Sequence, residues 1–285
     1  MLSPMNQLDL TELEASYCHS SITNGVVTIT MNRPEKLNGW TMEMMRAFTS
    51  AFNAAVASEA VKVIIFTGNG KYFSAGVNLS STIQLMAPRK LKNMIVEFNQ
   101  SLFEIFLNCP KPILVAANGP AIGASVTSAT LCNGIVASDR ATFSLPFAAL
   151  GVTPEGCSSV HLPRLIGSQN AQRMLGDEGW KPTAKEALEA GLIQWCVPHD
   201  KLLDKANQIA YGWIDNLETR QFLAGSKREE LIEINKAESS QLADAFLAKA
   251  FLHGQAKFLW SKGKYFPSVT FYALLLLRPF WSRFL

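Results

Sequence analysis

The sequence lacks both a long hydrophobic run and a basic or apolar leader. The longest continuous apolar stretch near the C-terminus covers residues 271–277, far short of the about 20 residues that a membrane-spanning helix needs. The first basic residue is Arg33, whereas Asp9, Glu12 and Glu14 are acidic, which is the wrong charge for a mitochondrial presequence. We therefore expect no membrane span, no secretory signal and no mitochondrial presequence.

Cysteine and net charge are also scarce. The cysteines are odd in number and share no metal-ligand spacing, so we interpret them as reduced, mostly buried thiols of an intracellular protein and expect no metal site. The formal net charge is only +3, with Lys and Arg scattered along the chain, which argues against nucleic acid as the main partner. The cysteines are Cys18, Cys109, Cys132, Cys157 and Cys196.

The motifs of two enzyme classes are incomplete. Residues 68–70 follow an apolar run as a dinucleotide-binding fingerprint would, but Phe73 stands where the third glycine belongs. His161 is close to Ser158 in the sequence, yet no GxSxG motif is present, which counts against a hydrolase. The other histidines are far apart and give no metal spacing.

What the sequence does contain is enough apolar residues for a large core. The chain has 285 residues, of which 48% are hydrophobic and 17% charged, and this composition is typical of a globular protein. Strand-like and helix-like segments alternate, which predicts α/β layers with buried parallel strands. We expect a loosely attached N-terminal arm at 1–20, a core at 21–200, a helical region at 201–264 and an atypical apolar tail at 265–285.

The pattern predicts specific elements within that core. Thr41 is a helix N-cap candidate, because Met44, Phe48 and Phe52 follow it at helical spacing. Further helices are expected at 90–108 and 121–132. Strands are expected at 26–31, 61–67, 113–117, 134–138 and 141–144.

Two small-residue turns follow predicted strands, at 74–78 (Ser-Ala-Gly-Val-Asn) and 122–125 (Ile-Gly-Ala-Ser). Small residues let a substrate approach the backbone, and a turn into a helix leaves N–H groups free. Two such donors aimed at one carbonyl oxygen form an oxyanion hole. Taken alone, each turn is more often an ordinary turn than part of an oxyanion hole, because short motifs frequently match by chance.

Glu155 is the candidate catalytic base. Phe143, Leu145, Phe147 and Leu150 precede it, so a pocket here would be apolar, and an apolar pocket raises the pKa of a carboxylate towards the range useful for proton transfer. The structural alternative is a helix start, with Thr at the N-cap, Pro at the first position and an acid in the first turn.

Together these segments resemble the crotonase superfamily of enoyl-CoA hydratases and isomerases over about residues 20–264. The matching segments are Asn32-Arg33-Pro34 with Leu37-Asn38, residues 73–79 (FSAGVNL), 111–113 (KPI), 118–123 (NGPAIG), 137–143 (ASDRATF), and 183–187 (TAKEA) followed by Gly191-Leu192.

The resemblance implies a crotonase-like spiral of ββα units, a C-terminal helical trimerisation region, and a homotrimer or hexamer that binds acyl-CoA. It implies the backbone N–H groups of Val77 and Ala124 as the oxyanion hole. No cofactor is expected, because the CoA thioester is itself the substrate and acidifies its C2. The implied substrate contacts are Lys36, Leu37, Ser74, Ala75, Gly76, Asn78, Leu79, Gly123, Phe147, Leu150 and Pro154.

The carboxylates distinguish the branches of the superfamily. At the two positions where the hydratases carry acids, this chain has Thr127 and Phe147. Peroxisomal-type isomerases instead carry one Glu in a Pro-Glu-Gly loop, which Glu155 matches. The resemblance therefore implies a Δ3,Δ2-enoyl-CoA isomerase of fatty acid β-oxidation. The alternatives are a hydratase or other acyl-CoA reaction, and a non-catalytic acyl-CoA-binding protein in which Glu155 only caps a helix.

The end of the sequence departs from the family. Peroxisomal members often stop near residue 264 with a Ser-Lys-Leu-like signal, whereas this chain continues to Arg283-Phe284-Leu285. We expect a peroxisomal location from the resemblance and otherwise a cytoplasmic one. The tail could pack on the helical region, contact a neighbouring subunit or expose an apolar patch that promotes association.

Overall fold

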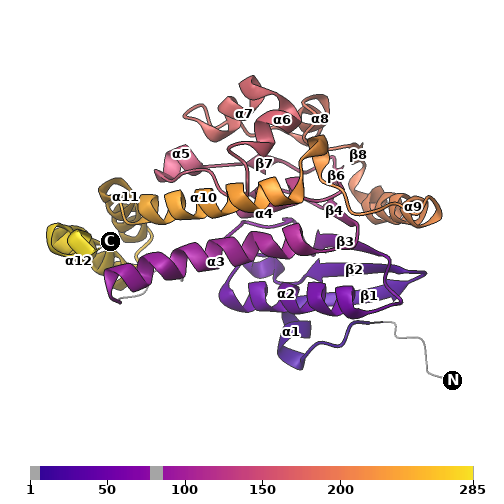
Figure 1. Ribbon diagram of the computed structural model, residues 1–285, viewed down its shortest axis with the longest axis horizontal. Coiled ribbons are helices and arrows are strands. Elements are labelled where there is room, and N and C mark those ends of the chain that lie inside the picture. The colour runs from indigo at the N-terminus through magenta and orange to yellow at the C-terminus, as the bar shows by residue number, and fades with distance from the viewer. Residues whose placement is uncertain (1–6, 78–85, 285) are drawn as a thin grey trace.

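A computed structural model describes residues 7–77 and 86–284. It is a mixed α/β structure in which helices cover both faces of a sheet (Figure 1). The strands are β1 Cys18–Thr23, β2 Val26–Met31, β3 Val63–Gly68, β4 Ile113–Ala117, β5 Ala121–Ile122, β6 Gly134–Ser138, β7 Phe143–Ser144 and β8 Trp195–Val197. The helices are α1 Glu12–Tyr17, α2 Met42–Ala57, α3 Pro88–Asn108, α4 Ala124–Thr130, α5 Phe147–Leu150, α6 His161–Ile166, α7 Ser168–Leu175, α8 Ala184–Glu189, α9 Leu202–Asp215, α10 Arg228–Phe246, α11 Lys249–Ser261 and α12 Tyr265–Trp281.

The main sheet has the order β1-β2-β3-β4-β6-β8, and β5 pairs with β7 in a small second sheet. The pairs from β2 to β8 are parallel, as the alternation of strands and helices predicted. Only β1 is antiparallel, because it joins β2 through Asn24-Gly25, where both residues have positive φ. That dipeptide is a favoured turn for a two-residue hairpin.

Alternate side chains of β3 fill two different cores. Ile64 and Phe66 pack beneath α2 and α3, while Val63 and Ile65 face α9 on the other side of the sheet. Both faces of the strand are therefore buried, which explains why its sequence is a continuous apolar run instead of an alternating one. The predicted cap of α2 is confirmed, since Thr41 Oγ1 accepts the N–H of Met44 at 3.3 Å.

Two expectations require correction. Residues 8–20 are not a loosely attached arm, because Leu8 and Cys18 are buried and Cys18 pairs with Met31. The helix expected over 121–132 is shorter, because Gly123 has a φ of 60° and a ψ of −127°, which breaks the segment into β5 and α4. Strand β8 was not predicted. Its three half-buried residues are too few to give a pattern.

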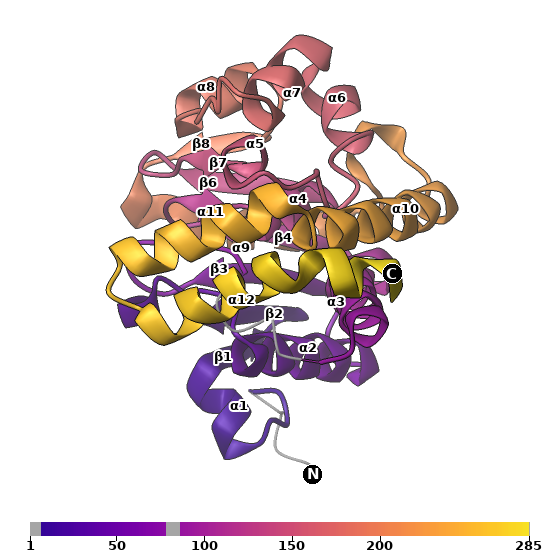
Figure 2. The same cartoon turned by 90° about the vertical axis from the view of Figure 1, so that its left-hand side faces the viewer.

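From α9 onward the regular elements of the described chain are helices, and α3 and α10 lie side by side across the sheet (Figure 1). Helices α11 and α12 form a hairpin at one end of the molecule (Figure 2). Within the described residues, no helix is both long enough and apolar enough to cross a membrane.

Candidate active site

A cavity of about 190 Å³ lies between the two small-residue turns, helix α3 and helix α10. Most of its walls are apolar, and among its described lining residues only Glu155 has a charged side chain. The lining residues are Met42, Ala75, Gly76, Val77, Met94, Ile95, Phe98, Asn99, Ile122, Gly123, Ala124, Pro146, Phe147, Leu150, Val152, Glu155, Leu242 and Phe246.

The structure brings together residues predicted from distant parts of the sequence. The turns that carry Val77 and Ala124 meet Glu155, Phe147 and Leu150 around this one cavity. Within the described part of the chain, neither the Val77 N–H nor the Ala124 N–H has a backbone acceptor. Both donors are therefore available to a ligand in the cavity.

Gly76 allows the two turns to come this close. A Cβ built at Gly76 would lie 2.3 Å from the carbonyl oxygen of Ile122 and 3.7 Å from the nitrogen of Ala124, and its φ of 74° is itself strained for other residues. Ser74 stabilises this arrangement with two hydrogen bonds. Its Oγ accepts the N–H of Gly76 at 3.0 Å within its own turn, and its carbonyl oxygen accepts the N–H of Ile122 in the other turn at 3.0 Å.

Four other predicted contacts do not line the cavity. Ser74 is buried beneath it, and Pro154 precedes Glu155 without lining it. Lys36 and Leu37 are exposed, but the carbonyl oxygen of Leu37 accepts the N–H of Ala75 at 2.9 Å, so their turn adjoins the cavity wall. The predicted contacts Asn78 and Leu79 lie outside the described residues.

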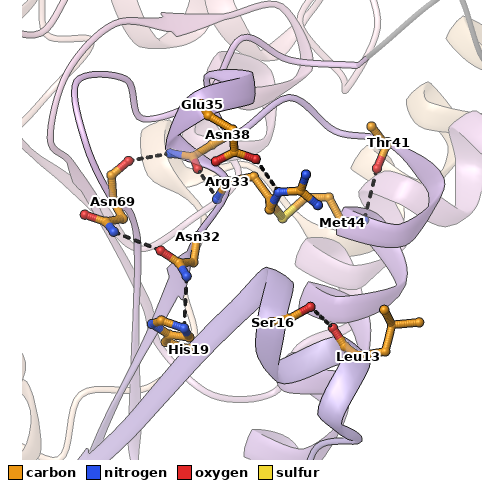
Figure 3. Close-up of polar contacts among 10 residues, drawn as sticks. All are labelled: Leu13, Ser16, His19, Asn32, Arg33, Glu35, Asn38, Thr41, Met44 and Asn69. Atoms are coloured by element: carbon orange, nitrogen blue, oxygen red, sulfur yellow. Dashed lines mark hydrogen bonds and ion pairs between the residues drawn. The ribbon is translucent and has the colours of Figure 1, made fainter.

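Asn38 holds the segment that precedes α2. Its Oδ1 accepts the N–H of Arg33 at 2.9 Å, and its Nδ2 donates to the carbonyl oxygen of Asn69 at 2.9 Å (Figure 3). The same Nδ2 also donates to the carbonyl oxygen of Tyr72 at 2.9 Å. Its own carbonyl oxygen accepts the hydroxyl of Ser74 at 2.7 Å. The asparagine of the Leu-Asn pair therefore positions the turn at 74–77 through one buried amide.

Glu155 lies in a loop, and no helix begins there. The hydroxyl of Thr153 is buried without a hydrogen-bond partner among the described residues, so it caps nothing. Gly156 and Cys157 both have positive φ, and a Cβ at Gly156 would lie 2.5 Å from Phe103. The glycine thus lets the loop press against α3 and turns the preceding carboxylate into the cavity.

Helix α10 anchors this loop through a second buried carboxylate. Glu238 accepts the backbone N–H groups of Cys157 at 2.6 Å and Ser159 at 2.8 Å. The hydroxyl of Ser158 also donates to the carbonyl oxygen of Glu155 at 2.7 Å. These bonds satisfy the carboxylate and the loop amides together, as burial requires.

Glu155 itself receives one polar contact from α3. Asn99 Nδ2 donates to Glu155 Oε2 at 2.6 Å, and Ser239 of α10 donates to Asn99 Oδ1 at 2.8 Å, which fixes the orientation of the amide. Burial raises the pKa of Glu155 to about 7, the hydrogen bond from Asn99 opposes that rise, and the charge of Glu238 adds to it. A carboxylate with this pKa exchanges protons readily near neutral pH.

Sequence reasoning missed Asn99, Ser239 and Glu238. The signal was nevertheless present, because each lies on the apolar, core-facing stripe of its helix. Asn99 falls between Ile95 and Leu102 of α3. A polar residue at such a position must be satisfied by a specific partner, which makes it a candidate for supporting a site.

The enoyl-CoA hydratase/isomerase family model matches residues 21–260. The chain therefore belongs to this family, within the crotonase superfamily. Enoyl-CoA delta isomerase 2 of Rattus norvegicus is 32% identical over 248 residues, 84% of this chain and 62% of the rat protein. Enoyl-CoA delta isomerase 3, peroxisomal, of Mus musculus is 36% identical over 179 residues, 61% of this chain and 55% of the mouse protein.

The fold is that of solved family members. The crystal structure of an enoyl-CoA hydratase/isomerase from Pseudoalteromonas atlantica T6c superposes with a TM-score of 0.72 at 27% identity, covering 86% of this chain and 97% of that one. The expected crotonase-like fold is thereby confirmed. The chain spans less than two thirds of the rat and mouse relatives, whose names describe the longer proteins.

Proposed function

We propose that the chain is a Δ3,Δ2-enoyl-CoA isomerase that moves a 3-enoyl double bond into conjugation with the thioester. The observation that carries this proposal concerns the described residues of an apolar cavity. Glu155 is the one carboxylate among them, and the N–H groups of Val77 and Ala124 have no backbone acceptor among them. One carboxylate suffices, because the reaction removes and returns one proton without adding water.

In the proposed mechanism, ionised Glu155 takes a proton from C2 of the 3-enoyl thioester. The electrons of the broken C–H bond form a dienolate, whose oxygen accepts hydrogen bonds from Val77 and Ala124. Glu155 then returns the proton to C4, so that the double bond lies between C2 and C3. Oxyanion donors stabilise the charge that develops, and the thioester carbonyl supplies the acidification of C2, so we propose no further cofactor.

The walls of the cavity suit the acyl chain. Phe147 and Leu150 are apolar and lie on α5 beside the loop of Glu155. We propose that the CoA portion passes the exposed turn of Lys36 and Leu37. The name of the mouse relative and the family resemblance support a peroxisomal location and a role in fatty acid oxidation, with assembly as a homotrimer or hexamer.

The two positions at which the hydratases carry acids argue against hydration of the double bond. Phe147 is apolar, and Thr127 is buried beneath Gly156, with its Oγ1 2.7 Å from a Cβ built at that glycine. Neither supplies the acid or base that addition of water needs.

A pair of absorbance assays tests the proposal. An isomerase produces the absorbance of a conjugated 2-enoyl-CoA when it is given a 3-enoyl-CoA. A hydratase removes that absorbance when it is given a 2-enoyl-CoA. Binding of both thioesters without a change in either assay would replace the isomerase by a non-catalytic acyl-CoA-binding protein.

Replacing Gly76 by Ala should lower kcat about 10²–10³-fold. The new Cβ forces the turn at 74–77 away from the carbonyl oxygen of Ile122, and the loss of one oxyanion donor typically costs about 2.7–4 kcal/mol. The matched control is Gly212→Ala in α9, where an added Cβ meets no atom within 4 Å. Wild-type kcat in Gly76→Ala, in steady-state kinetics, would contradict the proposed donor geometry.

Removing the amide of Asn99 should move the pH dependence of kcat/KM. The hydrogen bond from Asn99 lowers the pKa of Glu155, so Asn99→Ala should shift the half-maximal pH upward by about one unit, a typical value for one bond to a charged group. Asn235→Ala is the control, because this buried amide donates to Gln100 at 3.2 Å instead. An unshifted profile in Asn99→Ala would remove Asn99 from the tuning of the base.

A further inference from the structure

Helix α12 is apolar on both of its sides. Its inner side contains the buried Phe271 and Ser268, which pack on α11. Its outer side is also apolar, with Phe266 85% exposed, Leu276 77% exposed and Phe280 69% exposed. We call this side the outer face of α12, and it consists of Phe266, Val269, Tyr272, Leu276, Leu277 and Phe280.

Polar contacts to α11 and to the end of α10 fix the orientation of α12. Ser268 Oγ donates to the carbonyl oxygen of Ala256 at 2.7 Å, and Arg278 Nε donates to that of Leu247 at 2.9 Å. Figure 2 shows α11 and α12 side by side at the surface. A surface helix normally carries polar residues on its outer side. A helix whose apolar face is held outward therefore presents an interaction surface.

The charged residues of the segment that contains this face all have one sign. Residues 245–285 contain six Lys and Arg and no Asp or Glu. Since the whole chain has a net charge of +3 and this segment contributes +6, residues 1–244 have a net charge of −3. Lys262 and Lys264 are exposed in the turn of the hairpin, and Lys257 is exposed on α11. They have no carboxylate partner within the described residues.

We propose that the α11–α12 hairpin docks on the surface of an anionic lipid bilayer, with the outer face of α12 lying in the interface. An apolar helical face flanked by basic residues and aromatic rings is the composition of helices that lie in a membrane plane. The 17 residues of α12 are consistent with lying on a bilayer and not crossing it.

The same charges argue against pairing of this face with the same face of a second copy of this chain. A symmetric contact through this face would bring two segments together that each carry +6 and no acid. Like charges in contact destabilise an interface. An anionic lipid surface neutralises them.

The hairpin lies close to the cavity, so docking would bring the cavity near the bilayer. Leu242, Phe246 and Ile95 line the cavity and also belong to the apolar cluster beneath the inner side of α12. The apolar cluster beneath the inner side of α12 therefore extends from the hairpin to the wall of the cavity. An amphipathic ligand partitioned into the bilayer would be concentrated beside the cavity, whatever reaction takes place there.

Vesicle co-sedimentation of the full chain tests the proposal. Wild-type protein should bind phosphatidylcholine–phosphatidylserine vesicles, and binding should weaken with salt. Replacing Lys257, Lys262 and Lys264 together by Gln should weaken it about 100-fold, since each basic residue near the surface contributes about fivefold. Replacing Phe266 and Leu276 together by Ser should weaken it at least about tenfold.

Matched controls carry the same changes elsewhere. Lys181, Lys185 and Lys201 are exposed and lie outside the hairpin, and their triple replacement by Gln removes the same charge. Leu217→Ser removes an apolar side chain that is equally exposed, beyond the end of α9. Both controls should bind vesicles as the wild type does.

Three results would overturn the proposal. Wild-type protein that does not sediment with the anionic vesicles has no such surface. Equal losses in the hairpin variants and in their controls would show only nonspecific adsorption. If sedimentation equilibrium shows a smaller assembly for the Phe266/Leu276 variant while vesicles bind neither protein, the face joins copies of this chain.

Discussion

Glu155→Gln should lower kcat for 3-enoyl-CoA isomerisation at least about 10²-fold, and as much as about 10⁴-fold, the range for loss of a general base. Gln retains the shape and an oxygen that can accept the Asn99 bond of 2.6 Å, but it cannot take a proton from C2. Among the described residues lining the cavity, no other side chain carries a carboxylate that could replace it. Steady-state absorbance of the conjugated product measures the loss.

The second buried carboxylate of the same loop provides the matched control. Glu238 accepts two backbone N–H groups and does not line the cavity. Glu238→Gln places an amide N–H against one of those donors, so the variant should be less stable than the wild type. Its turnover per folded molecule should fall far less than that of Glu155→Gln. Equal losses in the two variants would assign Glu155 to loop structure instead of proton transfer.

The second large effect concerns stability. Burial raises the pKa of Glu155 from 4.5 to about 7, so the folded protein holds this proton more tightly than the unfolded chain does. The stabilisation from the protonated form is complete below pH 4.5 and is lost as the pH rises through 7. Since one pKa unit corresponds to 1.36 kcal/mol, the loss is about 3 kcal/mol.

The side-chain amide introduced by Glu155→Gln does not titrate, so this variant should gain stability relative to the wild type as the pH rises. The difference in unfolding free energy between variant and wild type should increase by about 3 kcal/mol from about pH 4.5 to about pH 8. Urea unfolding at several pH values measures it. Parallel pH dependences in the two proteins would mean that Glu155 has an ordinary pKa in the folded state. In that case ionised Glu155 would not destabilise the folded protein, and its pKa would not be raised towards the range that suits a general base.

Short sequence patterns predicted the secondary structure correctly where neighbouring residues determine it. The Thr41 cap and the apolar spacing after it predicted α2, and the largely apolar segment 61–67 predicted the buried strand that the structure shows as β3. Thr153 and Pro154 show the limit of such signals. Their sequence suits a helix start, but Gly156 and Cys157 adopt positive φ and Glu238 binds the loop amides, so no helix forms there.

The sequence by itself determined the α/β layering, the two small-residue turns, the family and the choice of Glu155 as the candidate base, because each depends on residues close together in the chain. The tertiary structure alone decided that Asn99 and Ser239, 140 residues apart, hydrogen-bond beside that carboxylate, that Glu238 anchors its loop, and that α12 turns an apolar face outward. Those contacts depend on how distant segments of the chain pack together. Neither the spacing nor the composition of one segment predicts which distant side chain will contact a buried polar group.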